Sequence, residues 1–458
     1  MKKRLNLLVA ITMVLALVLT ACSGSGSGKA TNDPGTGKAT DAPATVAPPT
    51  NEPAKELEGH LEIWTFDDGG TKVLADAFMA NNPKVTINIT NPGWNELPEN
   101  LATTIAAGKG APDVAYIEGS MFNRFAAGDG LEDLLQPPYD AGKHKADFSE
   151  SNWDRWHSLD GKKLIGMPWD MPPMVTFYRP DLIEAAGGPS DPAELAEYMK
   201  DADNVFKLGQ ALKANGVFLF ENDNTPIGLF TGGTGYFDRD FNYLRNNDDF
   251  VKAFDMAKQV KQLGLAMNTC AFWCDDGKAL ASSGKLAMVF YGPWAMNNIK
   301  ELGEDQLGKW RATALPFGLS APNGGSTMVI PSQGQNKELA YAFVEWALAS
   351  VEGNEVWIGN GGSPGYLPAW EGDFGAVTYE LLGDQPANEL FKELMKQVET
   401  AWVPFPFNSA ISDNVWNAKI DEALAKNMDA KAALQQIQEE VEKTFKVDID
   451  AVKAQVGK

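Results

Sequence analysis

The stretch Gly284-Lys285-Leu286-Ala287-Met288-Val289-Phe290-Tyr291-Gly292-Pro293-Trp294 decides how the rest of the chain is interpreted. Its run from Leu286 to Tyr291 is continuously apolar and rich in β-forming residues, which is typical of a strand covered on both faces. Gly292-Pro293 ends this strand, because proline lacks a backbone donor and glycine adopts tight backbone angles. Trp294 therefore follows the carboxyl end of a buried strand, where ligands of open α/β sheets bind. Core packing is the alternative role for this indole.

The composition sets limits on the class of protein. The chain has 458 residues, enough for a large core and two or three domains. It carries 39 Lys and Arg against 61 Asp and Glu, a formal net charge of −22. A surface this acidic repels phosphate backbones, so we do not expect nucleic-acid binding. His60, His144 and His157 are too scattered to indicate a metal cluster, and we expect no metal and no cofactor.

The first residues have the pattern of a secretory signal. Lys2-Lys3-Arg4 precede an apolar run from Leu7 to Leu19, which is too short to span a bilayer comfortably. The run ends in Leu19-Thr20-Ala21-Cys22-Ser23, which resembles a bacterial lipobox, so we predict a lipoprotein signal peptide over residues 1–21 and a lipidated Cys22. An ordinary leader with an incidental cysteine is the alternative.

The segment 22–56 consists largely of Gly, Ser, Thr, Pro and Ala, with almost no large apolar side chains. Such a composition cannot form a core and predicts a flexible tether. The chain is therefore expected to hold a globular body at the extracytoplasmic face of a membrane.

The body begins with strands that alternate with helices. Residues 61–66, 85–89 and 112–117 read as strands, and residues 71–82 and a segment ending at Gly108 have helical spacing. This alternation predicts a mainly parallel sheet of α/β type. Farther on, we expect helices over 193–214 and 249–263, strands over 217–220 and 327–331, and amphipathic helices in the C-terminal part.

Three segments are predicted to cross between two lobes. Gly166–Pro173 holds three prolines in a short span, which suits an extended connection and disfavours a helix. Further crossings are expected at Gly324-Gly325 and near Ser350–Gly353. The predicted boundaries are residues 57–168 and 325–350 for lobe 1, and residues 169–324 and 351–458 for lobe 2.

In this order, several segments resemble the bacterial extracellular solute-binding proteins of family 1, relatives of the maltodextrin-binding protein. The segments are the lipobox, His60–Trp64, Ala106–Val114, Gly166–Arg179, Gly284–Trp294 and Asn336–Ala340. The resemblance implies a two-lobed, type II periplasmic-binding-protein-like α/β fold with a three-segment hinge and a ligand cleft between the lobes. It also implies that a sugar, expected to be an oligosaccharide, is captured and delivered to the permease subunits of an ABC importer. We expect a monomer anchored by lipid to the outer face of the cell membrane.

A sugar site needs aromatic rings for the apolar faces of the sugar and strong acceptors for its hydroxyls. Carboxylates beside Trp and Tyr at strand ends and crossings supply both. By the resemblance, Trp294 stacks on sugar, and Asp67 or Asp68, Glu118 and Asp170 bind hydroxyls. Helix capping is the alternative for Asp67 or Asp68, a solvated charge for Glu118, and core packing for Trp416. The ligand-binding candidates are Trp64, Asp67, Asp68, Glu118, Trp169, Asp170, Asn222, Asp223, Trp294, Tyr366 and Trp416.

Cys270 and Cys274 flank Ala-Phe-Trp in a predicted loop. Since Cys22 is assigned to lipid, an even pair remains in an oxidising compartment, and we predict a disulfide. A helical conformation of this segment would strain such a bond.

Two other functions remain open. A lipid-anchored glycoside hydrolase would use two carboxylates about 5 to 10 Å apart, and acidic residues are plentiful. A binder of a non-sugar solute, such as a polyamine, would also suit an acidic cleft. No Ser–His–Asp order, zincin motif or Walker loop is present, so we predict a binding protein and no catalytic residue.

Overall fold

The computed structural model describes residues 56–358, 362–372, 376–398, 400 and 402–458. The predicted signal peptide, the lipidation site Cys22 and all of the predicted tether except Glu56 lie outside the described residues, so these remain predictions.

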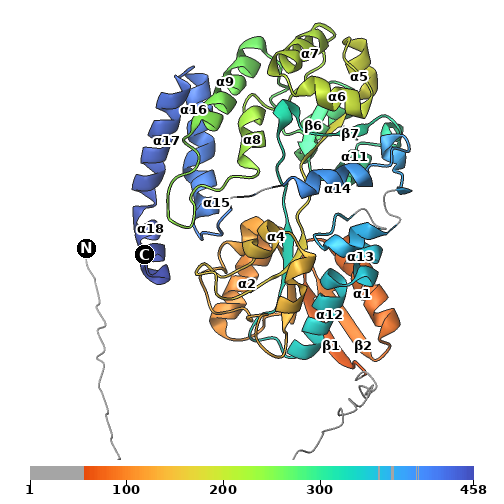
Figure 1. The fold of residues 1–458 in the computed structure, drawn as a ribbon, viewed down its shortest axis with the longest axis vertical. Helices are drawn as coiled ribbons and strands as arrows, with labels where there is room; N and C mark the ends of the chain where they lie inside the picture. The colour runs from red at the N-terminus through yellow and green to blue at the C-terminus, as the bar shows by residue number, and fades with distance from the viewer. Residues whose placement is uncertain (1–55, 359–361, 373–375, 399, 401) are drawn as a thin grey trace, which may run out of the picture. The chain divides into compact units, whose positions relative to one another are not determined.

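A five-stranded sheet forms the centre of the first lobe (Figure 1, lower part). Its strands are β1 (Gly59–Trp64), β2 (Val85–Thr90), β3 (Val114–Glu118), β4 (Met167–Asp170) and β8 (Ser326–Val329), in the order β2-β1-β3-β8-β4. β1 pairs in parallel with β2 and β3, whereas β8 is antiparallel to both β3 and β4. The carboxyl ends of β1 and β3 therefore lie at one edge of the sheet.

Helices cover this sheet with apolar faces. In α1 (Asp68–Asn81), Leu74 and Phe78 are buried against the sheet, and Phe78 meets Phe343 of α12 (Lys337–Ala349) edge to face, with ring centroids 5.3 Å apart. The other helices of this lobe are α2 (Glu96–Ala107), α3 (Gly119–Phe122), α4 (Glu150–Arg155) and α13 (Val351–Ile358).

The second lobe contains a three-stranded sheet in the order β6-β5-β7 (Figure 1, upper part). Its strands are β5 (Val175–Tyr178), β6 (Met288–Tyr291) and β7 (Arg311–Thr313), all paired antiparallel. Alternate residues of β6 enter separate apolar clusters: Met288 and Phe290 enter one, and Val289 enters the other. This sheet is therefore covered on both faces, as the continuous apolar run predicted.

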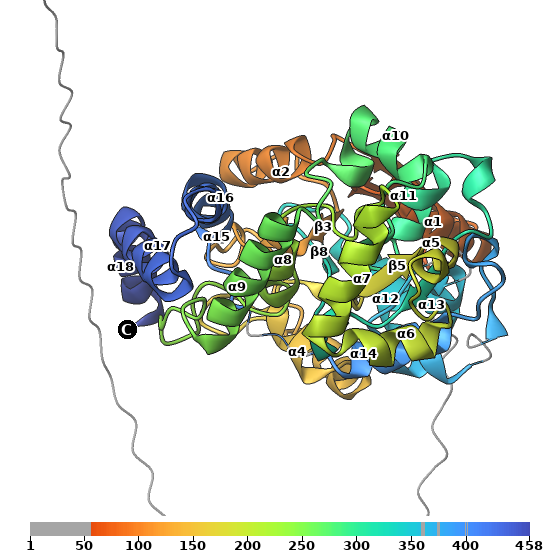
Figure 2. The ribbon, with the colours of Figure 1, turned by 90° about the horizontal axis from the view of Figure 1, so that it is seen from above.

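Local sequence signals define the long helix α9 (Asp248–Leu263). The Asn247 side chain accepts a hydrogen bond from the Phe250 amide at its start, and Gly264 ends it in the left-handed conformation, with φ 63°. Figures 1 and 2 both show the C-terminal helices grouped beside α9.

The remaining α-helices are α5 (Pro180–Ala185), α6 (Pro192–Met199), α7 (Ala202–Ala214), α8 (Thr225–Thr231), α10 (Asp275–Ser282), α11 (Ala295–Lys300), α14 (Asn388–Lys396), α15 (Asn408–Ile411), α16 (Asn417–Ala425), α17 (Ala430–Thr444) and α18 (Lys446–Val456).

Two linkers that connect the sheets run side by side in opposite directions. One joins β4 to β5 and the other joins β7 to β8. They are tied by backbone hydrogen bonds from Met174 N to Ala321 O (2.7 Å) and from Asn323 N to Pro172 O (2.9 Å). The Asp170 carboxylate accepts a further bond from the Ser326 amide (2.7 Å). Of the predicted crossing Gly166–Pro173, only Met171–Pro173 lie in the first linker, because Met167–Asp170 form β4, whereas Gly324-Gly325 lie in the second linker.

Some predicted details of the fold are wrong. The sheets are not mainly parallel, because β4, β5 and β8 each enter a sheet after the chain has changed direction, which produces antiparallel pairs. Residues 217–220 form isolated bridges through Phe218 and Phe220 and no full strand.

The contacts also bear on two predicted lobe boundaries. β4 keeps Trp169 and Asp170 in the first sheet, beyond the predicted end of that lobe at residue 168. α13 packs against α1 and α12, so the segment Ser350–Gly353 does not leave the first lobe.

Candidate functional site

A pocket of about 280 Å³ lies where elements of both lobes meet one linker. We call it the interlobe pocket. Glu118, Ser120 and Arg155 line it from the first lobe, and Pro322, Asn323 and Gly324 line it from the linker. The rest of its wall comprises Thr231 and Gly232 at the end of α8, Tyr236 and Arg245 from the connection between α8 and α9, and Thr400, Trp402, Ser412, Trp416 and Asn417 from the C-terminal part of the chain.

Arg155 connects this pocket to the linker. It lies at the end of α4, and its guanidinium donates a hydrogen bond from Nη1 to the Gly324 carbonyl (2.8 Å). A Cβ atom on Gly119 would lie 2.1 Å from Nη2 of Arg155, so only glycine at position 119 leaves room for this side chain. The guanidinium also lies over the rings of Trp156 and Trp402, at 4.9 and 5.9 Å from their centroids. Burial lowers the pKa of Arg155, and the nearby charges of Glu118 and Asp170 oppose this effect.

A second buried guanidinium, that of Arg245, lies on the aromatic side of the pocket. It stacks over Tyr236 at 3.8 Å and over Trp416 at 4.9 Å. Its Nε and Nη2 atoms both donate to the Thr234 carbonyl (3.0 and 2.7 Å), which fixes the plane of the group. The Tyr236 hydroxyl in turn bonds the Ser412 hydroxyl (2.7 Å). The pocket thus presents aromatic surface together with polar groups in fixed positions, a combination that suits small polar ligands.

Three aromatic rings in mutual contact lie next to the same linker, and we call them the indole cluster: Trp273, Tyr291 and Trp294. Trp294 follows β6 and begins α11, and its Nε1 donates to the Asn323 carbonyl (3.1 Å). The Asn323 side chain accepts from the Gly292 amide (2.8 Å). Because Asn323 also lines the interlobe pocket, the indole cluster and the pocket share one linker residue.

Two of the candidate carboxylates cap helices. Asp67 accepts a hydrogen bond from the Gly70 amide (3.1 Å) at the start of α1, and Asp68 is exposed in the first turn of that helix. Glu118 caps α3 by accepting from the Ser120 amide (2.7 Å) and also lines the interlobe pocket. Capping leaves a second oxygen on each carboxylate available. Trp64, at the end of β1, is half-buried against the apolar core around the first sheet.

The candidates at the first crossing are buried. The Trp169 ring is fully buried against Tyr116 and Trp357, at centroid distances of 3.8 and 4.7 Å. Asp170 is engaged by the Ser326 amide, and burial raises the pKa of its carboxyl to about 7. Both side chains lie within the first lobe and its linker.

The remaining candidates come from three separate segments of the chain, which hold Asn222 and Asp223, Tyr366, and Trp416. Asn222 is exposed, and its amide donates to the Thr225 hydroxyl (3.1 Å), while Asp223 pairs with the Asn268 side chain (3.2 Å). Tyr366 is buried against Phe148, with centroids 5.6 Å apart. Trp416 is buried as well, yet it lines the interlobe pocket. The structure thus brings Glu118 and Trp416 together in the pocket, with Trp294 beside it.

Sequence reasoning missed most of the pocket wall. Trp402 stands before Pro404 and Pro406, a setting like that of Trp169 between prolines, and this signal could have found it. Arg155 and Arg245 carry no such local signal, because their role depends on rings and carbonyls that come from distant parts of the chain.

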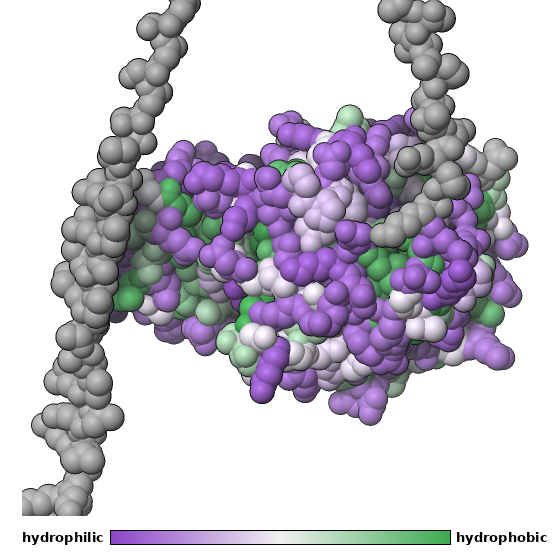
Figure 3. Space-filling view, turned by 90° about the horizontal axis from the view of Figure 1, so that it is seen from below, coloured by the Kyte–Doolittle hydropathy of each residue, from purple (hydrophilic) through white to green (hydrophobic). Residues whose placement is uncertain are grey.

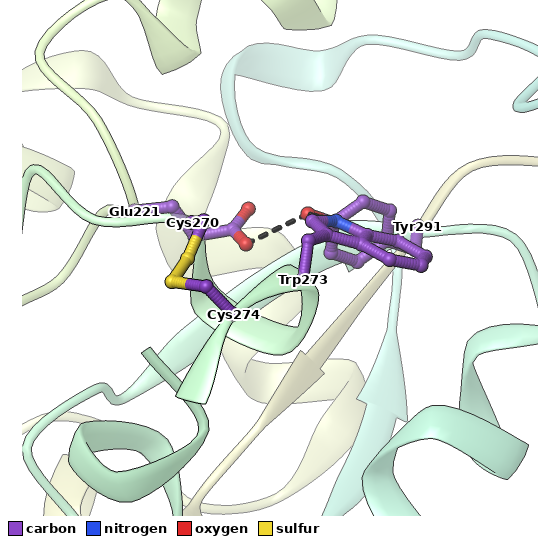
Figure 4. Close-up of a disulfide and its surroundings, with 5 residues drawn as sticks. All are labelled: Glu221, Cys270, Trp273, Cys274 and Tyr291. Carbon is purple, nitrogen blue, oxygen red and sulfur yellow. Dashed lines mark hydrogen bonds between the residues drawn. A yellow bond between two sulfur atoms is a disulfide. The ribbon is translucent and has the colours of Figure 1, made fainter. Parts of the chain in front are cut away.

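The predicted bond between Cys270 and Cys274 is present, with their Cα atoms 5.7 Å apart (Figure 4). The intervening residues form a single 3-10 turn (Ala271–Trp273), after which Cys274 is extended, so the pair avoids the helical geometry that would oppose bonding. Within the described ranges, no group of three or more His, Cys, Asp or Glu side chains could hold a metal ion. In the same ranges, every helix is too short or too polar for a membrane span.

On the face drawn in Figure 3, hydrophilic side chains cover most of the described surface, and apolar residues form separate patches. Across the described residues, Trp94 and Trp273 are the large aromatic side chains classed as exposed, at 51% and 57%.

The fold and the interlobe pocket together define a two-lobed α/β binding protein. The chain belongs to the bacterial extracellular solute-binding protein family, which it matches over residues 73–372. It is 25% identical over 387 residues to the arabinooligosaccharide-binding protein of Bacillus subtilis (strain 168), covering 81% of this chain and 82% of that protein.

Solved structures support the same fold. An extracellular solute-binding protein of family 1 superposes with a TM-score of 0.73 and 24% identity, covering 84% of this chain and 99% of the other. An ABC-transporter-associated binding protein from B. animalis subsp. lactis Bl-04, solved with β-1,6-galactobiose, superposes with a TM-score of 0.68 and 21% identity. This match covers 87% of this chain and 99% of the other. The predicted two-lobed fold and the predicted family are thus confirmed. The family consists of extracellular binding proteins, so the described body functions outside the cytoplasm.

Proposed function

We propose that this protein is the lipid-anchored, solute-binding component of an ABC importer, and that it captures an oligosaccharide between its lobes for delivery to the permease subunits. The observation that carries the proposal is the interlobe pocket, whose wall combines residues of both lobes, a linker and buried aromatic rings. The arabinooligosaccharide- and galactobiose-binding relatives support a carbohydrate as the class of ligand. Lipidation of Cys22 and a monomeric state belong to this proposal.

The chemistry of the pocket suits a sugar. Trp402 and Trp416 offer apolar faces, while Glu118, Asn323 and Asn417 offer acceptors and donors for hydroxyls. Arg155 and Arg245 are held by carbonyls and rings, so their remaining N–H groups are preorganised donors. Trp294 adds an aromatic surface beside the same linker residue.

Binding is expected to favour a closed arrangement. A ligand in the interlobe pocket contacts groups of both lobes, so it stabilises whichever arrangement brings those groups closest. Closure would bend the two linkers that carry Pro172, Asn323 and the positive-φ residues Gly324 and Gly325.

The test is calorimetry on the purified protein with arabino-oligosaccharides, galactobiose, maltodextrins and a panel of polyamines. We expect a Kd of roughly 1 μM, about 8 kcal/mol, for a neutral oligosaccharide, together with compaction in solution scattering. Binding of a polyamine and of no sugar would refute a carbohydrate ligand. Release of shorter sugars during incubation, followed by chromatography, would instead establish a glycoside hydrolase.

A further inference from the structure

The disulfide loop Cys270–Cys274 presents one large aromatic ring to solvent. Trp273, inside this loop, is 57% exposed, although burial of an indole is normally favourable. A rigidly held and exposed indole needs an explanation that packing within the chain does not supply.

The position of Trp273 is fixed from two sides. The disulfide closes the loop around a single 3-10 turn. On the other side, Nε1 of Trp273 donates to the Tyr291 hydroxyl (3.1 Å), which donates to the buried Glu221 carboxyl (2.8 Å). Figure 4 shows this row of side chains next to the two bonded sulfurs. The N–H group of the indole therefore has a hydrogen-bond partner, and the apolar face of the ring remains available for contact with a ligand.

Trp273 also lies next to the ring that the sequence placed in the site. Its centroid is 6.2 Å from that of Trp294, with an interplanar angle of 42°, and Tyr291 lies 5.5 Å from Trp294. Trp294 is bonded to Asn323, which lines the interlobe pocket. An aromatic surface therefore continues from the pocket edge to the disulfide loop.

We propose that Trp273 is a second stacking platform for the oligosaccharide, held beside Trp294 by the Cys270–Cys274 disulfide. This rests on the proposed function, and it adds that the ligand has more than one sugar unit in contact with the indole cluster. Sugar is the occupant because its units carry apolar C–H faces that stack on rings. Trp273 thereby favours longer ligands over monosaccharides, and the disulfide maintains that preference.

The test compares Trp273→Ala and Trp273→Phe with the wild-type full chain, by calorimetry against arabinose and arabino-oligosaccharides of two to four units. We expect Trp273→Ala to weaken binding of the longer sugars by roughly five- to tenfold. Its affinity for arabinose and its thermal midpoint should change little. Trp273→Phe keeps a ring and should retain most of the affinity.

A Cys270→Ser, Cys274→Ser double variant tests the loop. This variant should lose affinity for the longer sugars, as Trp273→Ala does. Dithiothreitol should weaken the binding of longer sugars by the wild type but not by this variant. If the wild type binds oligosaccharides and Trp273→Ala binds all lengths equally well, the platform is refuted while the proposed function stands. If the wild type binds none of these sugars, and neither galactobiose nor a maltodextrin, both the platform and the proposed function are refuted.

Discussion

The buried carboxyl of Glu221 allows a sharp test of the electrostatics of the second lobe. This residue is 7% exposed and accepts a hydrogen bond from the Tyr291 hydroxyl (2.8 Å). Burial raises the pKa of its carboxyl from 4.5 to about 7, and the hydrogen bond from Tyr291 acts in the opposite direction. The perturbation is Glu221→Gln, which keeps the size and the acceptor oxygen and removes the titrating proton.

The magnitude follows from linkage. Between pH 4.5 and 7, the folded state keeps a proton that the unfolded chain has released, so the free energy of unfolding falls as the pH rises through this window. At about 1.4 kcal/mol per pKa unit, the loss is about 3 kcal/mol by the time the pH exceeds the folded pKa. The stabilising contribution is complete below the unfolded pKa. Glutamine loses no proton, so the variant should gain about 3 kcal/mol relative to the wild type across the window.

The assay is urea unfolding of both proteins at a series of pH values from 4.5 to 8. Glu304→Gln is the matched control, because it makes the same substitution at an exposed carboxylate of the same lobe. A constant difference between Glu221→Gln and the wild type over the whole range would refute the reasoning. It would mean that the Tyr291 hydroxyl keeps Glu221 ionised in the folded protein.

Three further variants test the site and its supports. Trp294→Ala should weaken oligosaccharide binding by about 1–3 kcal/mol with the fold intact; unchanged affinity in calorimetry would remove this indole from the site. Gly325→Ala should lower the free energy of unfolding by about 1–3 kcal/mol, because its φ is +114° and a Cβ would lie 2.5 Å from Arg155 Nη1. Gly308→Ala, at φ +75° in open space, should cost less in the same urea experiment, and equal losses would contradict the role given to Arg155. Asp67→Ala should cost about 1 kcal/mol of stability through the lost helix cap, and a simultaneous loss of sugar affinity in calorimetry would show that Asp67 also contacts the ligand.

Much of the fold could be predicted because its signals are local. The apolar run before Gly292 became β6, and the helical spacing over 249–263 became α9, whose cap at Asn247 and end at Gly264 lie in the sequence itself. β7 has only three residues, Arg311–Thr313, and such a short segment shows no periodicity. The direction of strand pairing was wrong for a different reason. It depends on where the chain returns from the other lobe, which no local pattern records.

The residues of the candidate site also fall into those with a local sequence signal and those without one. Glu118 ends β3 and Trp294 comes shortly after β6. Strand ends can be predicted from local sequence, so both residues could be chosen as candidates, and they lie at or beside the pocket. Trp169 was predicted from the proline-rich crossing, but its ring lies in the core, because Tyr116 and Trp357 cover it. Arg155 and Arg245 became pocket residues only through contacts with rings and carbonyls far away in the sequence.

The place of β8 in the first sheet has a consequence for synthesis on the ribosome. β8 lies between β3 and β4, yet it is made only after β5, β6 and β7. The strands of the second sheet, residues 175–313, can therefore pair while β4 still lacks its neighbour. The first lobe, whose strands β1 to β4 are synthesised first, is thus the later of the two lobes to complete its sheet. A nascent chain halted before residue 326 exposes an unfilled gap between β3 and β4 to chaperones and proteases.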